Sequence, residues 1–279
     1  MSAQPLLEVR DLNVVFPMKG FRKPPLHVLK DITLDLAKGE TLGLVGESGS
    51  GKTTLGRAVL GLVHVHSGSI TFEGEEIANA SRRRRRELSR DIQVVFQDPY
   101  TSLNPSRTIE DTLSEPLLAQ NVSGRDARAR VRELLDRVHL PSDAARRLPR
   151  EFSGGQRQRV AIARALALQP KLIVCDEPVS ALDLSTQARV LDLFVEIQEA
   201  TGVSYLFVSH DLTVIRHISH RVIVMYRGEL VETGTAAQVT GDPVHPYTRN
   251  LLMSAPVPNP AAQRQRRAER AALRAVGAA

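Results

Sequence analysis

Eight consecutive residues near the start of the chain have the types and spacing of a phosphate-binding loop. Residues 46–53 fit the pattern G-x-x-x-x-G-K-[ST] at every position. The glycines let backbone N–H groups converge on phosphate oxygens at a helix start, where the helix dipole favours negative charge. We predict that Lys52 reaches the β- and γ-phosphates of a nucleotide and that the Thr53 hydroxyl binds Mg²⁺. The predicted nucleotide contacts here are Gly46, Glu47, Ser48, Gly49, Ser50, Gly51, Lys52, Thr53 and Thr54.

Two acidic residues, Asp176 and Glu177, directly follow a short apolar run, residues 172–175. Open α/β sheets bind their ligands at the carboxyl ends of strands, where these two acids are expected to lie. We predict that Asp176 holds the Mg²⁺ shell and that Glu177 polarises the attacking water. In the alternative reading both acids only cap the next helix, but Pro178 follows them directly and the phosphate-binding loop already requires a metal partner.

A glycine pair lies between two polar residues in the stretch Ser153-Gly154-Gly155-Gln156. Ser153 and Gln156 have the spacing of a capping box, which needs no ligand. The two glycines are not needed for a cap. They remove side chains from the first helical turn and expose N–H groups at the positive end of the dipole, which favours binding of a γ-phosphate.

His210 follows an apolar run, residues 203–208, that we expect to form a strand. A lone histidine is usually a hydrogen-bonded core residue. Its place at a strand end, in a chain that also contains the other motifs, favours a role as a γ-phosphate sensor.

The elements that must position these residues alternate between strands and helices. Strand patterns cover residues 41–45, 92–96, 172–175 and 203–208, and helical patterns cover residues 54–62, 156–168 and 190–200. This alternation predicts an α/β fold with a mainly parallel sheet wound with helices. Further strand patterns make the first third of the chain β-rich, and an apolar repeat from Ala127 to Val138 predicts a helical subdomain over about residues 101–150.

Composition limits the class of protein. The chain has 279 residues, 42% of them hydrophobic and 4% aromatic with no Trp, which favours a core of Leu, Val, Ile and Ala. The single cysteine, Cys175, excludes an internal disulfide. No signal sequence or membrane-spanning run is expected, so we predict a cytoplasmic protein that only partners hold at a membrane.

The charge is unevenly distributed. The net charge is +6, and the stretch 256–279 holds five arginines against Glu269, a net of +4 that leaves +2 for residues 1–255. We therefore predict a balanced domain over 1–255, an Arg/Ala-rich tail over 256–279, and no nucleic-acid partner. A second basic run, residues 82–86, is most simply a solvated helix face, with an anion or partner contact as the alternative.

In order and spacing, the motifs resemble those of the nucleotide-binding subunits of ABC transporters, over nearly the whole of residues 1–235. The resemblance identifies Gln97 as the Q-loop residue, residues 152–156 as the signature, residues 180–183 as the D-loop and His210 as the switch histidine. It implies a P-loop NTPase cassette with an N-terminal antiparallel β subdomain and an inserted α-helical subdomain. Phe152 replaces the commoner leucine of the signature, a conservative difference.

The resemblance also implies the cofactors and the assembly. ATP and Mg²⁺ are expected, with Thr53, Gln97 and Asp176 around the metal and with Glu177 and His210 as catalytic residues. In this family two cassettes meet head to tail, and each ATP lies between the phosphate-binding loop of one subunit and the signature of the other. Ser153, Gly154, Gly155 and Gln156 are thus expected to act on the partner's ATP, beside D-loop Asp183. Phe16, or alternatively the nearby Phe21, falls where the family stacks an aromatic ring on adenine.

Three stretches are similar to the ATPase subunits of dipeptide and oligopeptide importers, the branch that includes nickel and glutathione importers. They are residues 95–105, 177–183 and 245–248. The similarity implies an energy-coupling subunit at the cytoplasmic face of a bacterial inner membrane. Its expected partners are a second and different ATPase subunit, two permease subunits and, indirectly, a solute-binding protein. Many members of the branch carry C-terminal cysteines; this chain has none there, so no iron–sulfur site is expected. The rival from another class is a soluble ABC ATPase that acts on DNA or the ribosome.

Overall fold

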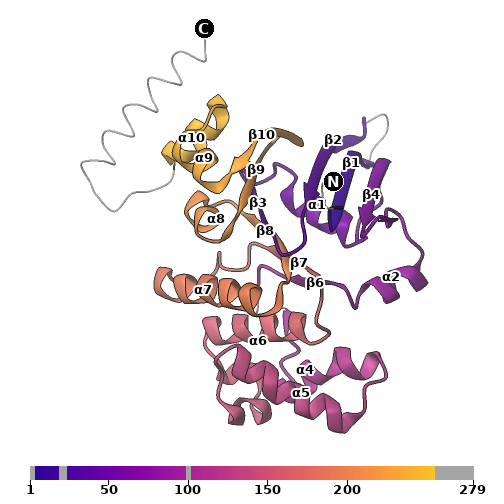
Figure 1. Ribbon diagram of the computed structural model, residues 1–279, viewed down its shortest axis with the longest axis vertical. Coiled ribbons are helices and arrows are strands. Elements are labelled where there is room, and N and C mark those ends of the chain that lie inside the picture. Colours follow the sequence, from indigo (N-terminus) through magenta and orange to yellow (C-terminus); the bar gives the residue numbers. More distant parts are fainter. Residues whose placement is uncertain (1–3, 19–23, 99–101, 255–279) are drawn as a thin grey trace.

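The computed structural model describes residues 4–18, 24–98 and 102–254 (Figure 1). Its strands are β1 (Leu7–Phe16), β2 (Leu26–Leu36), β3 (Thr41–Val45), β4 (Ser67–Phe72), β5 (Glu75–Glu76), β6 (Ile92–Val95), β7 (Leu172–Asp176), β8 (Ser204–Ser209), β9 (Arg221–Tyr226) and β10 (Glu229–Thr235). Its α-helices are α1 (Lys52–Val59), α2 (Arg82–Leu88), α4 (Ile109–Ala119), α5 (Gly124–Arg137), α6 (Gly154–Leu166), α7 (Leu184–Thr201), α8 (Leu212–Ile218), α9 (Ala236–Gly241) and α10 (Pro246–Ser254). Two short 3₁₀ helices, η1 (Ser142–Arg146) and η2 (Pro149–Glu151), lead into α6.

The strands form two sheets. The larger sheet has the order β10-β9-β3-β8-β7-β6, and every neighbouring pair is parallel except β10 with β9. The smaller sheet has the order β2-β1-β4-β5 and is antiparallel throughout. The mainly parallel sheet wound with helices and the N-terminal antiparallel subdomain are both confirmed.

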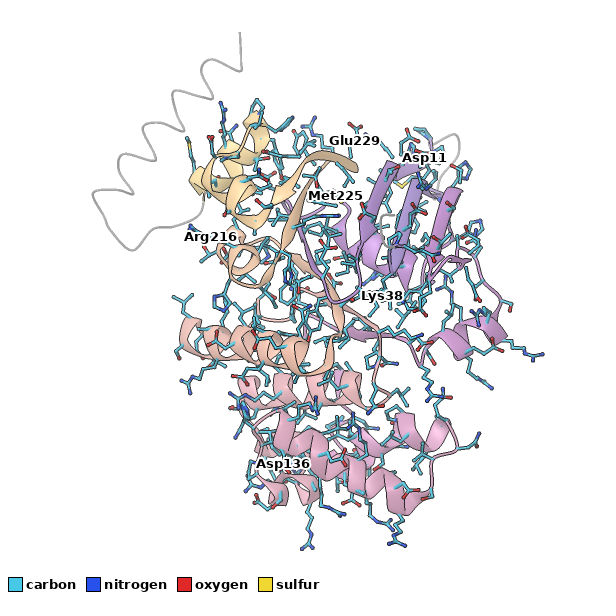
Figure 2. The ribbon with its side chains drawn as sticks, in the orientation of Figure 1. Asp11, Lys38, Asp136, Arg216, Met225 and Glu229 are labelled. Carbon is cyan, nitrogen blue, oxygen red and sulfur yellow. The ribbon has the colours of Figure 1, made fainter. Side chains whose placement is uncertain are left out.

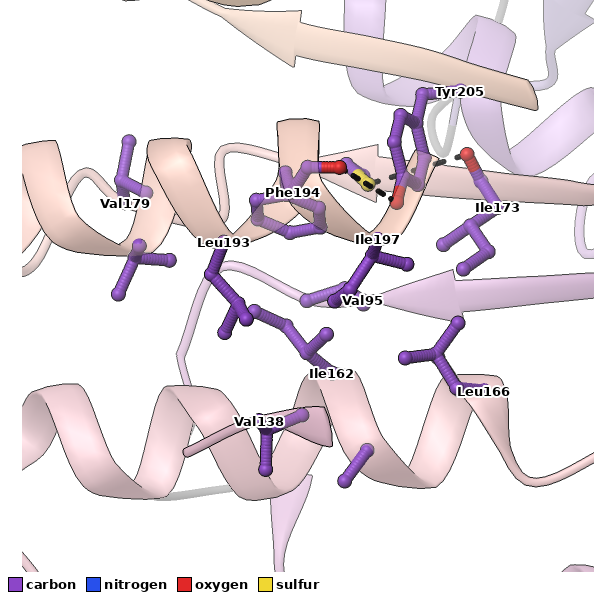
Figure 3. Close-up of a cluster of buried hydrophobic side chains, with 14 of the residues drawn as sticks. Val95, Val138, Ile162, Leu166, Ile173, Val179, Leu193, Phe194, Ile197 and Tyr205 are labelled. Atoms are coloured by element: carbon purple, nitrogen blue, oxygen red, sulfur yellow. Dashed lines mark hydrogen bonds between the residues drawn. The ribbon is translucent and has the colours of Figure 1, made fainter. Parts of the chain in front are cut away.

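The larger sheet separates two hydrophobic cores. Leu42 and Leu44 of β3 pack with α1 and the antiparallel sheet, whereas Val45 packs in the core that contains α6, α7 and α8. In the second core the ring of Phe194 lies edge-on to those of Tyr205 and Phe207, with centroid distances of 5.4 and 5.5 Å. Figure 3 shows the Tyr205 hydroxyl, which donates a 3.2 Å hydrogen bond to the Phe194 carbonyl. Because side chains alternate across a strand, burial on both sides fixes the register of β3.

Helices fill the chain between β6 and β7. In Figure 1, α4 and α5 lie at one end of the molecule, below α6 and α7. The predicted apolar repeat is the buried face of α5, and the Ser123 hydroxyl accepts the Asp126 N–H at the start of this helix. The cap and the repeat together explain why the helix forms here.

The arginine run of α2 is only partly solvated. Arg82, Arg83 and Arg86 are exposed, as expected, but Arg85 turns inward and donates hydrogen bonds to the carbonyls of Val59 and Ile77. A pattern of identical residues gives no sign of which one turns inward. Arg85 thus ties α2 to the end of α1.

We expect Gly61→Ala to destabilise the fold through Arg85. Gly61 has φ +68°, and an added Cβ would lie 2.1 Å from Arg85 Nε. The left-handed backbone costs an alanine about 1–2 kcal/mol, and displacing the guanidinium from its carbonyl acceptors adds roughly 1–3 kcal/mol. The control is Gly202→Ala, with φ +69° and no described atom within 4 Å of the added Cβ. Equal losses of unfolding free energy in urea titrations of the two variants would contradict the role of Arg85.

Candidate nucleotide site

The phosphate loop, residues 46–53, joins β3 to α1. Gly49 and Gly51 have φ +80° and +109°, a region that disfavours other residues. A Cβ on Gly46 would lie 2.2 Å from the carbonyl oxygen of Met225, a residue of β9 labelled in Figure 2. The loop is therefore packed closely against β9, with its glycines at positions where a side chain would be strained or would clash.

Lys52 is folded back over this loop. Its side chain is buried, with 4% exposure for the residue, and Nζ donates 2.8 Å hydrogen bonds to the carbonyls of both Gly46 and Glu47. Burial lowers the pKa of Lys52, and the carboxylates of Glu177, Asp176 and Glu47 oppose that shift. The ammonium is thus held among acceptors that phosphate oxygens can replace.

Thr53 and Asp176 meet across the ends of two elements. The Thr53 hydroxyl at the start of α1 donates a 3.0 Å hydrogen bond to Asp176 Oδ1 at the end of β7. Burial raises the pKa of Asp176, the Thr53 hydrogen bond opposes it, and the neighbouring Glu177 raises it further. A hydroxyl and a carboxylate whose charge is poorly solvated are a donor set that fits Mg²⁺, a hard cation that prefers oxygen ligands.

Glu177 and His210 are brought together from the ends of β7 and β8. The Glu177 N–H donates to the Val208 carbonyl at 3.0 Å, and Glu177 has a left-handed φ of +49°. Its Oε2 lies 2.9 Å from Nδ1 of His210. A non-glycine residue held in this backbone region is a feature that gathers at functional sites. The sequence predicted both residues but not this contact.

Most of the predicted nucleotide contacts line one open pocket of about 310 Å³. Its walls are Val28, Ser48, Gly49, Gly51, Lys52, Thr53, Thr54, Gln97 and Glu177. Phe16 lies at the end of β1 with 37% exposure and is not among these residues, and Phe21 lies outside the described residues. Sequence reasoning missed Val28, because an apolar strand residue carries no chemical signal until the fold shows its neighbours.

The glycine pair at the start of α6 lies in a different pocket. This pocket, also of about 310 Å³, is lined by Ser153, Gly155, Gln156, Arg159, Thr186 and Arg189, none of which lines the phosphate-loop pocket. Ser153 and Gln156 form the capping box, through a 3.0 Å bond from the Ser153 N–H to Gln156 Oε1 and a 3.3 Å bond from the Gln156 N–H to the Ser153 hydroxyl. Ser153 and Gln156 therefore cap the start of α6, a function that requires no ligand. Within one chain, the predicted signature and the phosphate loop are not brought together.

Two residues beside this pocket have structural tasks. A Cβ on Gly155 would lie 2.3 Å from Cγ2 of Thr186, so the glycine allows α6 to approach α7 closely. Asp183 caps α7 by accepting the N–H groups of Ser185 and Thr186 at 3.1 and 3.0 Å. Hydrogen bonds from Ser185 and Thr186 hold the pKa of Asp183 far below its usual range. The predicted D-loop residue thus acts as a helix cap inside its own chain.

Two protein-family models match parts of this sequence. Residues 29–180, more than half of the chain, match the family model described as ABC transporter. The chain belongs to the ABC transporter family. This ATP-binding cassette also matches, over residues 231–277, a model described as the C-terminal region of oligopeptide/dipeptide transporters. That match crosses the boundary at 255/256 where we expected a separate tail, and residues 256–279 lie outside the described part of the structure.

The cassette has close relatives in sequence. It is 49% identical over 272 residues to the glutathione import ATP-binding protein GsiA of Escherichia coli K12, a match that covers 96% of this chain and 44% of that protein. The protein of the same name from Pectobacterium atrosepticum is 49% identical over 269 residues, with coverages of 95% and 43%. The chain therefore spans less than half the length of these curated relatives.

Solved structures agree with the cassette fold. CbiO1 of Clostridium perfringens, part of the ABC transporter complex cbiONQ, has a TM-score of 0.77 and 28% identity, over 86% of this chain and 92% of that one. The ATP-binding cassette MJ0796, solved as a dimer with ADP and phosphate, has a TM-score of 0.74 and 29% identity, over 82% and 98% of the two chains. Among the described residues, no helix combines the length and the apolar character needed to cross a membrane.

Proposed function

We propose that this cassette is the ATP-hydrolysing, energy-coupling subunit of a bacterial importer. The observation that carries the proposal is the convergence of Lys52, the Thr53–Asp176 pair and the Glu177–His210 pair at the carboxyl ends of β3, β7 and β8. Open α/β sheets carry their chemistry at this edge. A basic phosphate clamp, a metal-binding pair and a carboxylate beside a histidine together supply the parts that ATP hydrolysis requires.

Each residue has a separate task in the proposed reaction. The loop N–H groups and Lys52 bind the phosphates, and Thr53 and Asp176, with Gln97, hold Mg²⁺. When bound, Mg²⁺ neutralises charge that develops on the phosphate oxygens. Glu177 orients a water for attack on the γ-phosphorus and accepts its proton. His210 holds the Glu177 carboxylate, because its Nδ1 lies 2.9 Å from Oε2. Its place at the end of β8, beside Glu177, lets it also respond to the γ-phosphate.

In the described part of the structure, the phosphate-loop pocket contains no signature residue of its own chain, which supports a second cassette as partner. The Ser153–Gln156 helix start lines its own pocket, away from the phosphate loop of the same chain. We propose that each ATP lies between the loop of one cassette and the signature of the other, with Asp183 near the junction. The dimeric form of MJ0796 supports the pairing of two cassettes. The partner is expected to be a different chain, as is usual in this branch.

An apolar groove supports a permease partner. It has a volume of about 250 Å³, and its walls include Leu62 after α1, Leu88 of α2 and Phe96 after β6. Leu62 is 61% exposed and Phe96 38% exposed, so two large apolar side chains border the groove and remain open to a partner. Phe96 directly precedes Gln97 of the nucleotide pocket. We propose that a permease helix docks here, which holds the cassette at the cytoplasmic face of the inner membrane.

The cargo is proposed from the branch. The C-terminal match to oligopeptide/dipeptide transporters and the similarity to glutathione import proteins both indicate short peptides, and glutathione is itself a tripeptide. A nickel importer is the alternative within the branch. The solute itself would contact a binding protein and the permease, so no residue of this chain is assigned to it.

The test of this function is the dependence of ATP hydrolysis on association. If two cassettes complete each site, the rate of an equimolar mixture of this chain and its partner cassette should rise more steeply than the total protein concentration, up to about fourfold per doubling while both chains are mostly monomeric. The mixture should be faster than either chain alone, and the chain should co-purify with a permease. A rate of the mixture that stays strictly proportional to concentration and equals the sum of the separate chains would contradict the shared site. Tight, salt-sensitive binding to duplex DNA or ribosomes, without a permease, would favour the rival soluble ATPase.

A further inference from the structure

The phosphate loop is hydrogen-bonded to a residue from the far end of the chain. The backbone N–H of Glu47 donates to the hydroxyl oxygen of Tyr247, at 2.9 Å. Glu47 lies in the part of the chain that matches the ABC transporter model, and Tyr247 lies in the part that matches the C-terminal region of oligopeptide/dipeptide transporters. This contact joins the two regions at the nucleotide site.

The ring of Tyr247 is held on the strand beside the loop. It packs on Tyr226 with a centroid distance of 4.2 Å and an interplanar angle of 36°. Tyr226 ends β9, which pairs with β3 and therefore runs alongside the strand that leads into the loop. In the turn that follows, the Gly228 N–H donates a 3.0 Å hydrogen bond to the Ser50 carbonyl. The loop is thus fastened from the same side at two points, Glu47 and Ser50.

The helix that carries Tyr247 is itself fixed at its start. The Glu232 carboxylate of β10 accepts the N–H groups of Val244 and His245, at 2.7 and 3.1 Å. Nδ1 of His245 accepts the N–H of Tyr247 at 3.2 Å. The first two bonds fix the residues that lead into α10, and the third satisfies a backbone donor that the first turn of α10 would otherwise leave unpaired. The position of the Tyr247 hydroxyl is therefore set by β10 and not by the loop alone.

We propose that Tyr247 is a positioning residue for ATP: its hydroxyl holds the Glu47 N–H so that the phosphate loop is already in its binding conformation. The C-terminal region then sets nucleotide affinity through one hydrogen bond. The proposal rests on the assignment of residues 46–53 to ATP. Tyr247 does not line the phosphate-loop pocket, so it acts through the backbone and touches no reacting atom. A preorganised loop loses less conformational freedom on binding, which strengthens binding without changing the chemical step.

The test is Tyr247→Phe, which keeps the ring on Tyr226 and removes only the hydroxyl that accepts the Glu47 N–H. In the chain of 279 residues we expect Mg-ATP to bind about three- to tenfold more weakly, the effect of losing one hydrogen bond. KM for ATP should rise by the same factor while kcat stays within twofold of the wild type, measured at matched protein concentrations. Unchanged affinity, or a fall in kcat with constant KM, would overturn the proposal.

A matched control separates this effect from a general loss of stability. Tyr205→Phe also removes a tyrosine hydroxyl that makes one backbone hydrogen bond, here to the Phe194 carbonyl; Tyr205 is fully buried, whereas Tyr247 is half-buried. Tyr205 pairs with Thr41, at the opposite end of β3 from the phosphate loop. This variant should lower Tm and leave KM for ATP unchanged. If both tyrosine variants raised KM equally, the effect would be structural and Tyr247 would have no special role.

The donor of this hydrogen bond, the Glu47 N–H, can be removed as well. Glu47 has a negative φ, so Glu47→Pro deletes the N–H without requiring a left-handed backbone. In that background Tyr247→Phe should have no further effect on ATP affinity, whereas additive losses would contradict the proposed bond. Lys52→Ala in the same titrations tests the underlying assignment. If Lys52→Ala bound ATP normally, the loop assignment itself would fail; if only Tyr247→Phe were silent, the positioning role alone would fail.

Discussion

Glu177→Gln is expected to abolish steady-state ATP hydrolysis while leaving ATP binding intact. The glutamine has the same shape and can keep the contact with His210, which is 2.9 Å from the carboxylate in the wild type. It cannot accept a proton from the attacking water. Loss of a positioned general base typically lowers rates by about 10² to 10⁴-fold. The measurements are phosphate release at saturating ATP and ATP affinity by calorimetry.

The control for this variant is Glu229→Gln. Glu229, labelled in Figure 2, starts β10 and forms an exposed ion pair with Lys30, so turnover should be unchanged. Near-normal hydrolysis by Glu177→Gln would refute Glu177 as the essential activator. Loss of ATP binding in the same variant would instead show that the carboxylate is needed to form the pocket.

Lys52→Ala is expected to weaken ATP binding more than any other single change in the phosphate loop. The buried ammonium already makes two hydrogen bonds to carbonyls, and phosphate oxygens are stronger acceptors for the same donors. Losing a charge-assisted hydrogen bond costs about 1.5–3 kcal/mol, which corresponds to roughly 10- to 150-fold in affinity. Calorimetric titration with Mg-ATP measures this directly.

Lys38→Ala is the matched control for Lys52→Ala. Lys38 lies just before β3 (Figure 2), is exposed and pairs with Glu73 at 3.0 Å, so its loss should leave ATP affinity unchanged. Thermal melting of both variants shows whether each is folded. An unchanged affinity in folded Lys52→Ala would contradict the assignment of the loop.

The parts of the fold that followed from the sequence are those with a strong local signal. Short apolar runs bounded by glycine or acidic residues gave β3 and β7, because a strand buried on both faces leaves little room for polar residues. The apolar pattern predicts α7 only from residue 190, which is wrong, because the helix begins at Leu184. Leu184 is 83% exposed, so the first turns of this helix do not follow the apolar period. The Asp183 cap was the signal that would have located it.

The contacts that the sequence could not predict are long-range. Val28 lines the nucleotide pocket from β2, Arg85 reaches the end of α1, and Tyr247 reaches the phosphate loop from 200 residues away. Each depends on which elements become neighbours, and a local pattern does not carry that information. The signature illustrates a different limit. Ser153 and Gln156 form a helix cap, and the same two residues are proposed to contact the partner's ATP. Neither their spacing nor their geometry within one chain distinguishes capping from ATP binding.

The separation of the phosphate-loop pocket from the signature pocket has a genetic consequence. If the cassettes pair head to tail as proposed, a defect at Lys52 of this chain and a defect in the signature of its partner fall in the same ATP site. Such defects in two cassettes mask one another, and their combination is no worse than either alone. Defects at Lys52 and Gly155 of this one cassette fall in different ATP sites and disable both. The unit on which selection acts is then the composite site, whose halves come from two different cassettes.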